Sequence, residues 1–331
     1  MVVCGKCGKT AVVRQEYSRL DYCASCFSSM FEAKIAKANH QFGLLRRGDV
    51  VAVGVSGGKD SGAMLFALDK LARKIGSIEL KPILVDEGIA GYRDKAAKCA
   101  KQLCKTLEIE LQTVSAKKVF GVTLDQTIKL RENADKLHGA CSYCGVLRKY
   151  CLNKAARDAG ATKLAIGHNA DDFGQTFLMN LLRGEAARIE QFGVKTSNPQ
   201  RKLFIPRIRP LAYCLEIECA NYCVLNEIPF HRGGCPYAHE AFRGEVKDFL
   251  NQEEEKHPGV KNSLLHSALQ VNEQFRHNAN LAEKGKRQAG KENKKTLEEN
   301  ASTCNQCGEY AGRTSKGLCK ACELIEGLAK K

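Results

Sequence analysis

The central part of the chain alternates between short β-branched runs and longer segments in which apolar residues recur at helical spacing. Strands are predicted at residues 49–55, 81–88, 109–115 and 162–169. Helices are predicted at residues 62–76, 92–108 and 146–160. Because helices that connect parallel strands cover both faces of the sheet, this alternation predicts an α/β fold with a parallel sheet.

Three polar clusters follow the predicted strands. They read SGGKDS at residues 56–61, VDEG at residues 85–88 and GHNADD at residues 167–172. In open parallel sheets the ligand site lies at the carboxyl ends of the strands. We therefore expect the three clusters to meet in one site.

Composition adds an expected partner and compartment. The 331 residues are 44% apolar, enough for a substantial core, and 52 Lys and Arg side chains outnumber 37 Asp and Glu side chains. The net charge of +15 favours a polyanionic partner such as nucleic acid over solubility alone. No apolar run approaches the roughly 20 residues that span a bilayer. The N-terminal residues lack the apolar core of a signal peptide, so we expect a cytoplasmic protein.

Seventeen cysteines indicate metal sites or reactive thiols, because disulfides are rare in the cytoplasm. Each end of the chain carries two C-x-x-C knuckles at the spacing of a zinc ribbon. The two sets are Cys4, Cys7, Cys23 and Cys26, and Cys304, Cys307, Cys319 and Cys322. We predict one structural zinc in each set, since four thiolates leave no open position, with redox thiols as the alternative.

The SGGKDS cluster is typical of a phosphate-binding loop between a strand and a helix. Gly57 and Gly58 allow close approach of the backbone, Lys59 adds positive charge, and serines at both ends supply hydroxyl groups. Amides at the start of a helix favour anions. The cluster differs from a Walker A loop, because Asp60 follows the lysine and the first glycine is too near.

Acidic residues follow the other two strands. Asp171 and Asp172 in GHNADD suit Mg²⁺ bound beside a triphosphate, and they equally suit the first turn of a helix. Both roles are compatible. Asp86 ends the second strand, where it is predicted to contact adenosine or a metal ion, or to act as a cap.

The pair Cys141 and Cys144 has no second pair nearby, and Cys235 is its predicted partner because it follows two glycines and precedes a proline in an exposed turn. Three thiolates suit an iron–sulfur cluster that keeps one iron free for an exogenous ligand. The alternatives are a persulfide on Cys235 and a zinc ion with His231 or His239 as the fourth ligand. The cysteines predicted to be buried and inert are Cys99, Cys104, Cys151, Cys214, Cys219 and Cys223.

Taken together, the motifs are similar to those of the tRNA 2-thiouridine synthetases, within the PP-loop ATP pyrophosphatase superfamily. The resemblance covers nearly the whole chain and rests on the terminal zinc knuckles, SGGKDS, CSYCGVLRKY, GHNADDFGQTFLMNLLRG and GGCPYAHEAFRGEVKDFL. It implies a PP-loop domain of the adenine nucleotide alpha hydrolase type, flanked by zinc ribbons. The segments CSYCGVLR, LMNLLRGE and CPYAHEAFR favour the branch that acts on the wobble uridine over the sister branch that acts on the T-loop.

The resemblance also implies the site residues. ATP and Mg²⁺ are expected at Ser56, Gly57, Gly58, Lys59, Asp60, Ser61, Asp86, Gly167, His168, Asp171 and Asp172. A [4Fe-4S] cluster is expected on Cys141, Cys144 and Cys235. The catalytic residues expected are these three cysteines with Lys59, Asp60, Asp171 and Arg148. The sister branch tends to have lysine in place of Arg148, and a guanidinium is a poorer proton donor than an ammonium.

The implied reaction begins when the C2 oxygen of a tRNA uridine attacks the α-phosphorus of ATP and pyrophosphate departs. AMP is then a good leaving group, and sulfur replaces it at C2. The sulfur comes from sulfide or from a ubiquitin-like carrier with a C-terminal thiocarboxylate. Arginines within residues 181–188 and 198–210 are expected to hold the tRNA backbone, and the family implies a homodimer.

The expected organisation has four parts: an N-terminal zinc ribbon at residues 1–30, a catalytic domain at residues 31–277, a charged linker at residues 278–300 and a C-terminal zinc ribbon at residues 301–331. Two other classes of function compete with the thiolase. One is a PP-loop enzyme that adenylates or amidates a small metabolite, and the charge and the cysteine triad argue against it. The other is a non-catalytic RNA-binding zinc protein, and the intact SGGKDS motif argues against that.

Overall fold

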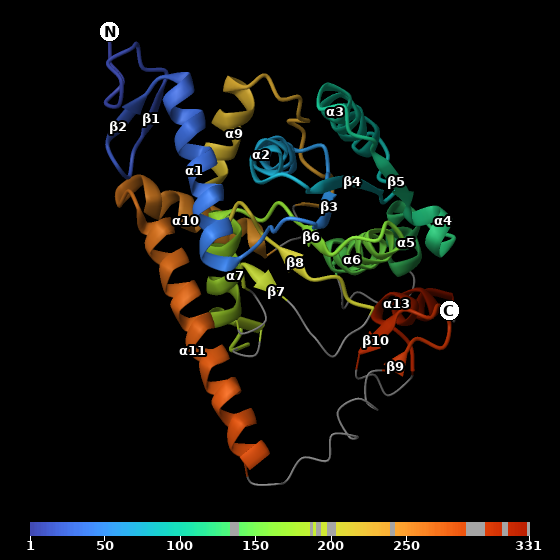
Figure 1. Ribbon diagram of the computed structural model, residues 1–331. Coiled ribbons are helices and arrows are strands. Elements are labelled where there is room, and N and C mark those ends of the chain that lie inside the picture. Colours follow the sequence, from blue (N-terminus) through green and yellow to red (C-terminus); the bar gives the residue numbers. More distant parts are fainter. Residues whose placement is uncertain are drawn as a thin grey trace.

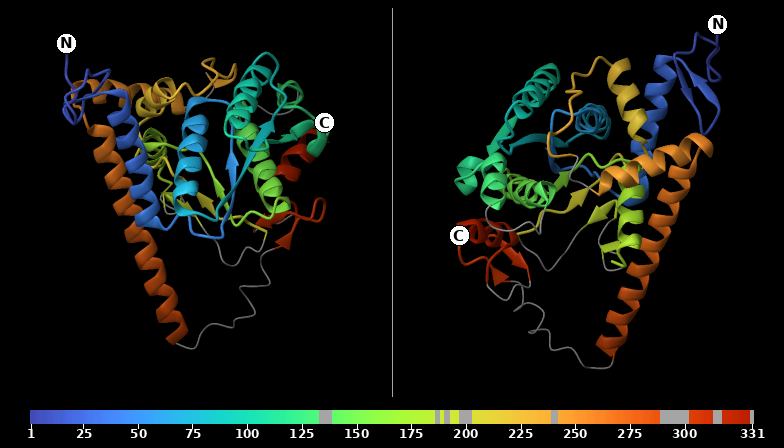
Figure 2. Two further views of the ribbon diagram at one scale, coloured as in Figure 1. Left: turned by 45° about the horizontal axis from the view of Figure 1, so that its top comes forward. Right: turned by 180° about the vertical axis from the view of Figure 1, so that it is seen from behind.

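The computed structural model describes residues 1–132, 139–185, 188–189, 193–196, 203–238, 242–288, 302–312 and 317–329. Figure 1 and Figure 2 show a central sheet with helices on both faces and with the two ends of the chain on opposite sides of the molecule. No helix in the described ranges is long and apolar enough to cross a membrane.

The chain begins with an antiparallel hairpin of β1 (Val13–Gln15) and β2 (Leu20–Tyr22), followed by α1 (Ala24–Phe42). Gly43 ends α1 in the left-handed conformation, with φ 57°, which is a common helix stop. The domain boundary expected at residue 30 therefore falls inside a continuous helix.

Six strands of the described chain form the central sheet, in the order β5-β4-β3-β6-β8-β7. They are β3 (Val50–Gly54), β4 (Glu79–Asp86), β5 (Gln112–Ser115), β6 (Lys163–Ala165), β7 (Lys195–Thr196) and β8 (Arg207–Ile208). The sheet is parallel except for β7, which pairs antiparallel with β8 at one edge. The predicted α/β fold with a parallel sheet is confirmed.

Helices connect these strands and continue beyond them. They are α2 (Lys59–Ile75), α3 (Arg93–Thr106), α4 (Ala116–Phe120), α5 (Leu124–Glu132), α6 (Ala140–Asp158), α7 (Ala170–Leu182), α9 (Glu216–Leu225), α10 (Arg243–Lys256) and α11 (Val260–Gln288). The helix predicted at residues 146–160 in fact begins at Ala140, so it carries Cys141 and Cys144. Residues 278–288 of the expected linker extend α11, and residues 289–300 lie outside the described part.

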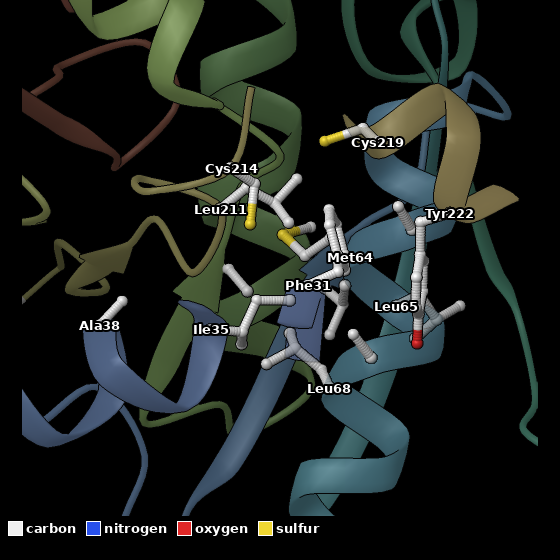
Figure 3. Close-up of a cluster of buried hydrophobic side chains, with 14 of the residues drawn as sticks. Phe31, Ile35, Ala38, Met64, Leu65, Leu68, Leu211, Cys214, Cys219 and Tyr222 are labelled. Carbon is white, nitrogen blue, oxygen red and sulfur yellow. The ribbon is translucent and has the colours of Figure 1, made fainter. Parts of the chain in front are cut away.

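Alternate residues of the strands supply two cores, as the pleat of a strand requires. On one face Val51 and Val53 pack with α1, α2 and α9, and the ring of Phe31 stacks on Tyr222 with centroids 4.2 Å apart. Figure 3 shows this cluster, in which side chains of α1, α2 and α9 interdigitate. On the other face Ala52 packs against α6. Helix α1 is thus part of the main core, although it follows the first cysteine set.

The C-terminal module consists of β9 (Ser302–Thr303), β10 (Tyr310–Gly312) and α13 (Lys320–Ala329), and it lies beside α5 and α6. Leu147 of α6 is buried in one cluster with the cysteines of this module. Arg157, near the end of α6, makes two hydrogen bonds to the Glu309 carboxylate, of which Nη1 to Oε2 measures 2.8 Å. The module is therefore held on the helix that carries Cys141 and Cys144.

We expect Arg157→Ala to lower the free energy that holds the C-terminal module on α6 by about 2–3 kcal/mol. The substitution leaves the nearly buried Glu309 carboxylate without its partner. A chelator should then remove one zinc per chain faster than from the wild type. The matched control is Lys154→Ala, which breaks an exposed pair with Asp158 on the same helix and should cost under about 0.5 kcal/mol. Equal zinc release from both variants would show that the ion pair does not hold the module.

Candidate functional site

The two terminal cysteine sets have the geometry of tetrahedral metal sites. Within each set all four Sγ atoms lie within 4.8 Å of one another. Cys7 and Cys23 have Sγ atoms 3.6 Å apart, and Cys307 and Cys319 have Sγ atoms 3.7 Å apart. Zinc–thiolate bonds of about 2.3 Å give tetrahedron edges of about 3.8 Å. Each set therefore fits one zinc ion.

Replacing Cys7 by serine should lower the zinc content from two ions to one per chain, because three thiolates and an alcohol bind zinc much more weakly. The measurement is elemental analysis of the purified protein. The control is Cys99→Ser, since Cys99 lies on α3 outside either set. Two zinc ions retained by Cys7→Ser would contradict the assignment.

The nucleotide loop, residues 56–61, runs from the end of β3 into the first turn of α2, at the carboxyl edge of the sheet. Gly57 has φ 84°, and a Cβ on it would lie 1.9 Å from the carbonyl oxygen of Ala96 in α3. Only glycine fits this position. The hydroxyls of Ser56 and Ser61 are 3.0 Å apart, and α2 begins at Lys59. The loop amides and the start of α2 can therefore receive an anion, and ATP binding by these residues stays a prediction.

The Lys59 ammonium lies between two carboxylates. Its Nζ is 3.1 Å from Asp60 Oδ2 and 2.8 Å from Glu216 Oε1. Burial acts to lower the pKa of Lys59, but Asp60 and Glu216 outweigh it and raise the pKa above its usual value. Glu216 was not predicted from the sequence, because it lies at the start of α9 in a segment without any motif. The lysine stays charged at every physiological pH.

The GHNADD cluster forms the turn from β6 into α7. Asn169 and Asp172 form a capping box, with side chain and backbone bonded reciprocally at 3.1 Å. Burial raises the pKa of Asp172 to about 6, opposed by Arg243. The Asp171 carboxylate accepts hydrogen bonds from Lys261 Nζ at 2.6 Å and from the Glu216 amide at 2.6 Å. Both acids thus stabilise the start of a helix, and their part in binding Mg²⁺ stays a prediction.

Two further predicted residues lie at the same edge. His168 Nδ1 accepts a hydrogen bond from Arg209 Nε at 3.2 Å, and burial together with Arg209 lowers the pKa of His168 well below its usual range, so the ring is neutral. Asp86 Oδ1 accepts a hydrogen bond from the Gly88 amide at 2.9 Å, which closes a turn at the end of β4. Contact of Asp86 with adenosine or a metal ion stays a prediction.

The three middle cysteines come from two segments of the chain that pack against each other. Cys141 and Cys144 lie one turn apart on one face of α6, and Cys235 packs against the apolar cluster that contains buried Cys144. The Cys141 thiol is 3.8 Å from the carbonyl oxygen of Tyr237, two residues after Cys235. Within the described ranges, only the terminal sets bring three ligand atoms within 4.8 Å of one another, so these three thiols stand further apart.

That wider spacing bears on the kind of centre. A single zinc ion would draw its thiolates to about 3.8 Å, whereas the thiolates of a cluster bind different irons. The ring of His231, the described alternative ligand, packs against Tyr92 with centroids 5.5 Å apart. His239, the other alternative, lies outside the described residues. Which centre the three cysteines hold stays a prediction.

Arg148 contacts the cysteine site directly. Its Nη2 is 3.0 Å from Cys144 Sγ, and its Nε is 2.7 Å from Glu87 Oε1. Burial raises the pKa of the Cys144 thiol, and the Arg148 charge opposes that shift. Glu87 was missed from the sequence because Asp86 precedes it in the same motif and suggested the same chemistry.

The nucleotide loop and the cysteine site are bonded to each other. His231 lies four residues before Cys235, and its amide donates to the carbonyl oxygen of Gly57 at 2.9 Å. Arg93 Nη1 donates to the carbonyl oxygen of Ser56 at 2.9 Å. A parallel sheet with a glycine-rich loop between β3 and α2 is the arrangement of a PP-loop nucleotide-binding protein.

The chain belongs to the PP-loop family, because residues 28–254 match the model of the PP-loop domain. Residues 3–28 match the N-terminal LIM domain of the 2-thiouridine synthetase TtuA. The cytoplasmic tRNA 2-thiolation protein 1 of Mus musculus is 37% identical over 98% of this chain and 72% of its own length. The tRNA 2-thiolation protein NcsA of Haloferax volcanii is 32% identical over 98% of both chains.

A solved structure is also similar. The U34-tRNA thiolase NcsA from Methanococcus maripaludis, determined with its [4Fe-4S] cluster, has a TM-score of 0.73 and 33% identity, and the match covers 82% of this chain and 89% of that one. The family predicted from the motifs is confirmed.

Proposed function

We propose that this chain is an ATP-dependent tRNA sulfurtransferase that converts the wobble uridine, U34, to 2-thiouridine. The observation that carries the proposal is the bonded contact between the nucleotide loop and the cysteine site, through the His231 amide and the Gly57 carbonyl. An adenylated uridine held at the loop would reach sulfur at the cysteines without leaving the site. The relatives named for tRNA thiolation support the reaction, and the similar U34-tRNA thiolase of Methanococcus maripaludis supports the choice of uridine.

The loop residues would carry the first step. Its amides and the start of α2 hold the phosphates of ATP, and Lys59 neutralises charge as the uridine C2 oxygen attacks the α-phosphorus and pyrophosphate departs. Asp60 lies beside Lys59 and accepts a hydrogen bond from Asn169 at 3.0 Å, so it can hold the lysine or a Mg²⁺ ion in place. Asp171 contributes by fixing the start of α9 and hence Glu216.

Sulfur transfer would follow at Cys141, Cys144 and Cys235. A [4Fe-4S] cluster held by these thiolates supplies an iron without a protein ligand, at which sulfide can be bound and activated. Attack of the sulfide on C2 breaks the C2–O bond, and AMP leaves with the oxygen. Arg148 lies beside Cys144 and keeps its positive charge, so it can stabilise the leaving phosphate rather than donate a proton.

The remaining features follow the same proposal. Two zinc ions hold the terminal modules, residues 1–30 and 301–331, on the catalytic domain. The sulfur donor is sulfide or a ubiquitin-like protein with a C-terminal thiocarboxylate, and the enzyme acts in the cytoplasm as a homodimer. The name of the mouse relative supports the compartment for that protein.

A group of neighbouring cations supports binding of tRNA. Lys149 follows Arg148 on α6, and Arg207 lies on β8; neither has a carboxylate partner among the described residues. Burial lowers the pKa of Lys149, and the like charges of Arg207 and Arg209 lower it further. Cations that lie close enough to lower one another's pKa suit an anionic ligand such as the tRNA backbone.

We expect Lys149→Gln to weaken tRNA binding and to reduce the slope of log affinity against log salt by about one. The measurement is tRNA affinity at several salt concentrations. The control is Lys105→Gln in the last turn of α3, at the opposite edge of the sheet, because helices between parallel strands run back toward the amino edge. An unchanged slope in Lys149→Gln would show that this lysine does not contact a phosphate.

Mapping the product tests the proposed uridine. Protein with its cluster is incubated without oxygen with ATP, Mg²⁺, sulfide and unmodified tRNA, and the thiolated nucleotide is located after digestion. We expect 2-thiouridine at U34. Thiolation at the T-loop uridine, position 54, would assign the sister specificity, and equal thiolation by iron-free protein would show that sulfide attacks the activated uridine without a cluster.

A further inference from the structure

Glu87 lies between two arginines at the centre of the site. It follows the last residue of β4, and its side chain is 2% exposed. One carboxylate oxygen, Oε2, pairs with Arg93 Nη2, and the other, Oε1, accepts from Arg148 Nε at 2.7 Å. Glu87 and Arg93 are both buried, whereas the Arg148 side chain is 46% exposed. A buried ion pair contributes little net stability, because removing its charges from water costs about as much as their attraction returns. The bonds of Glu87 therefore point to a role in placing the two arginines.

The two arginines point to different parts of the site. Arg93 is the first residue of α3, and its Nη1 donates to the carbonyl oxygen of Ser56 in the nucleotide loop at 2.9 Å. Arg148 lies one turn after Cys144 on α6, and its Nη2 donates to Cys144 Sγ at 3.0 Å. Each guanidinium thus uses one nitrogen for Glu87 and another for its target. Because a guanidinium is a rigid plane, a shift at one nitrogen displaces the other.

Shared packing next to the carboxylate favours a joint movement. Tyr92, which precedes Arg93, contacts the ring of His231, and the His231 amide donates to the carbonyl oxygen of Gly57. Tyr92 also packs on the apolar cluster that contains Cys144 and Cys235. Two chains of contacts therefore join the loop to the cysteine site. The Ser56 carbonyl is joined through Arg93, Glu87 and Arg148, and the Gly57 carbonyl is joined through the segment before Cys235.

We propose that Glu87 is a positioning residue that couples the nucleotide loop to the cysteine site, so that occupation of the loop by ATP changes the hydrogen bond from Arg148 to Cys144. The inference rests on the proposed function, because it assumes ATP at the loop and a cluster on the cysteines. Hydrogen bonds to the sulfurs of a cluster set its reduction potential. Nucleotide binding should therefore shift the reduction potential of the cluster.

The test uses Glu87→Asp in the full chain with its cluster. This variant keeps the charge and withdraws the carboxylate by one methylene, so Arg148 loses its support while the local charge stays constant. We expect a lower reduction potential than in the wild type, because the Cys144 sulfur loses a donor. We also expect tRNA thiolation to fall about 10- to 100-fold, the usual effect of removing an outer contact to a metal ligand.

The coupling is measured by adding a non-hydrolysable ATP analogue with Mg²⁺ to each protein. The wild type should change its potential or its electron paramagnetic resonance spectrum, and Glu87→Asp should bind the analogue without that change. Arg93→Lys should behave in the same way, because a lysine ammonium lacks the two separate nitrogens with which Arg93 contacts Ser56 and Glu87. The control is Glu79→Asp, a carboxylate at the exposed start of the same strand, which should respond as the wild type does.

Two results would overturn the inference. One is an analogue-induced change in Glu87→Asp as large as in the wild type, and the other is no change in the wild type itself. Circular dichroism of each variant verifies that it is folded. If Glu87→Asp does not fold, the test is carried out with Arg93→Lys instead. Failure of the proposed function is separate, because it would appear as a wild-type protein with cluster and ATP that makes no 2-thiouridine.

Discussion

Cys235→Ser is expected to remove the iron centre and to abolish tRNA thiolation while both zinc ions remain. Cys235, which packs on the cluster of side chains that contains Cys144, is the proposed third thiolate, and an alcohol is a poor ligand for iron in a cluster. Loss of an outer contact to a metal ligand already costs about 10- to 100-fold in activity, so loss of a ligand should cost more than about 100-fold. Iron and zinc content, the absorption of the cluster and 2-thiouridine formation are measured on one preparation.

The control for this prediction is Cys99→Ser on α3, which should keep iron, zinc and activity. Retention of a full cluster in Cys235→Ser would show that Cys235 is not its third ligand. Loss of activity with normal iron would instead assign Cys235 to a persulfide. The same substitution thus separates the two kinds of sulfur chemistry that the sequence left open.

Gly57→Ala is expected to lower nucleotide affinity by at least about 100-fold. The new Cβ would lie 1.9 Å from the carbonyl oxygen of Ala96, and a residue with a Cβ at φ 84° is also strained by about 1–2 kcal/mol. A Cβ cannot overlap a backbone oxygen, so the loop must move away from α3. The hydrogen bond from the His231 amide to the Gly57 carbonyl is then broken. The amides that hold the phosphates then lose their common orientation.

Calorimetric titration with a non-hydrolysable ATP analogue measures this effect. The control is Gly327→Ala in α13, where an added Cβ meets no atom within 4 Å and binding should be unchanged. Because the movement also disturbs the segment before Cys235, Gly57→Ala should lower the yield of cluster as well. Wild-type affinity in Gly57→Ala would contradict the position of the loop against α3.

The sequence predicted most of the fold because its signals are local. The strand before SGGKDS and the helix after it are set by β-branched and helical periodicity, and both are confirmed within a few residues. The start of α6 was placed six residues too late, because Gly145 and the two cysteines interrupt the apolar pattern there. Both terminal cysteine sets were found because zinc ligands have fixed spacing along the chain.

The site was only partly predictable, because contacts between distant residues leave no periodic signal. Cys235 could be chosen by its glycine-rich turn, whereas Glu87 and Glu216 sit beside more conspicuous acids or in an ordinary helix. The roles of Arg93 and Lys261 depend on which strands adjoin, and the strand order places their partners. Burial and pairing, rather than residue type, distinguish these residues from surface charges.

The central claim is that the nucleotide loop and the cysteine site act in one reaction. The most direct measurement is formation of 2-thiouridine in tRNA by the cluster-loaded wild type without oxygen, with sulfide present and with ATP either added or omitted. We predict thiolation only when the cluster and ATP are both present. Thiolation without ATP, or none with both, would contradict the account.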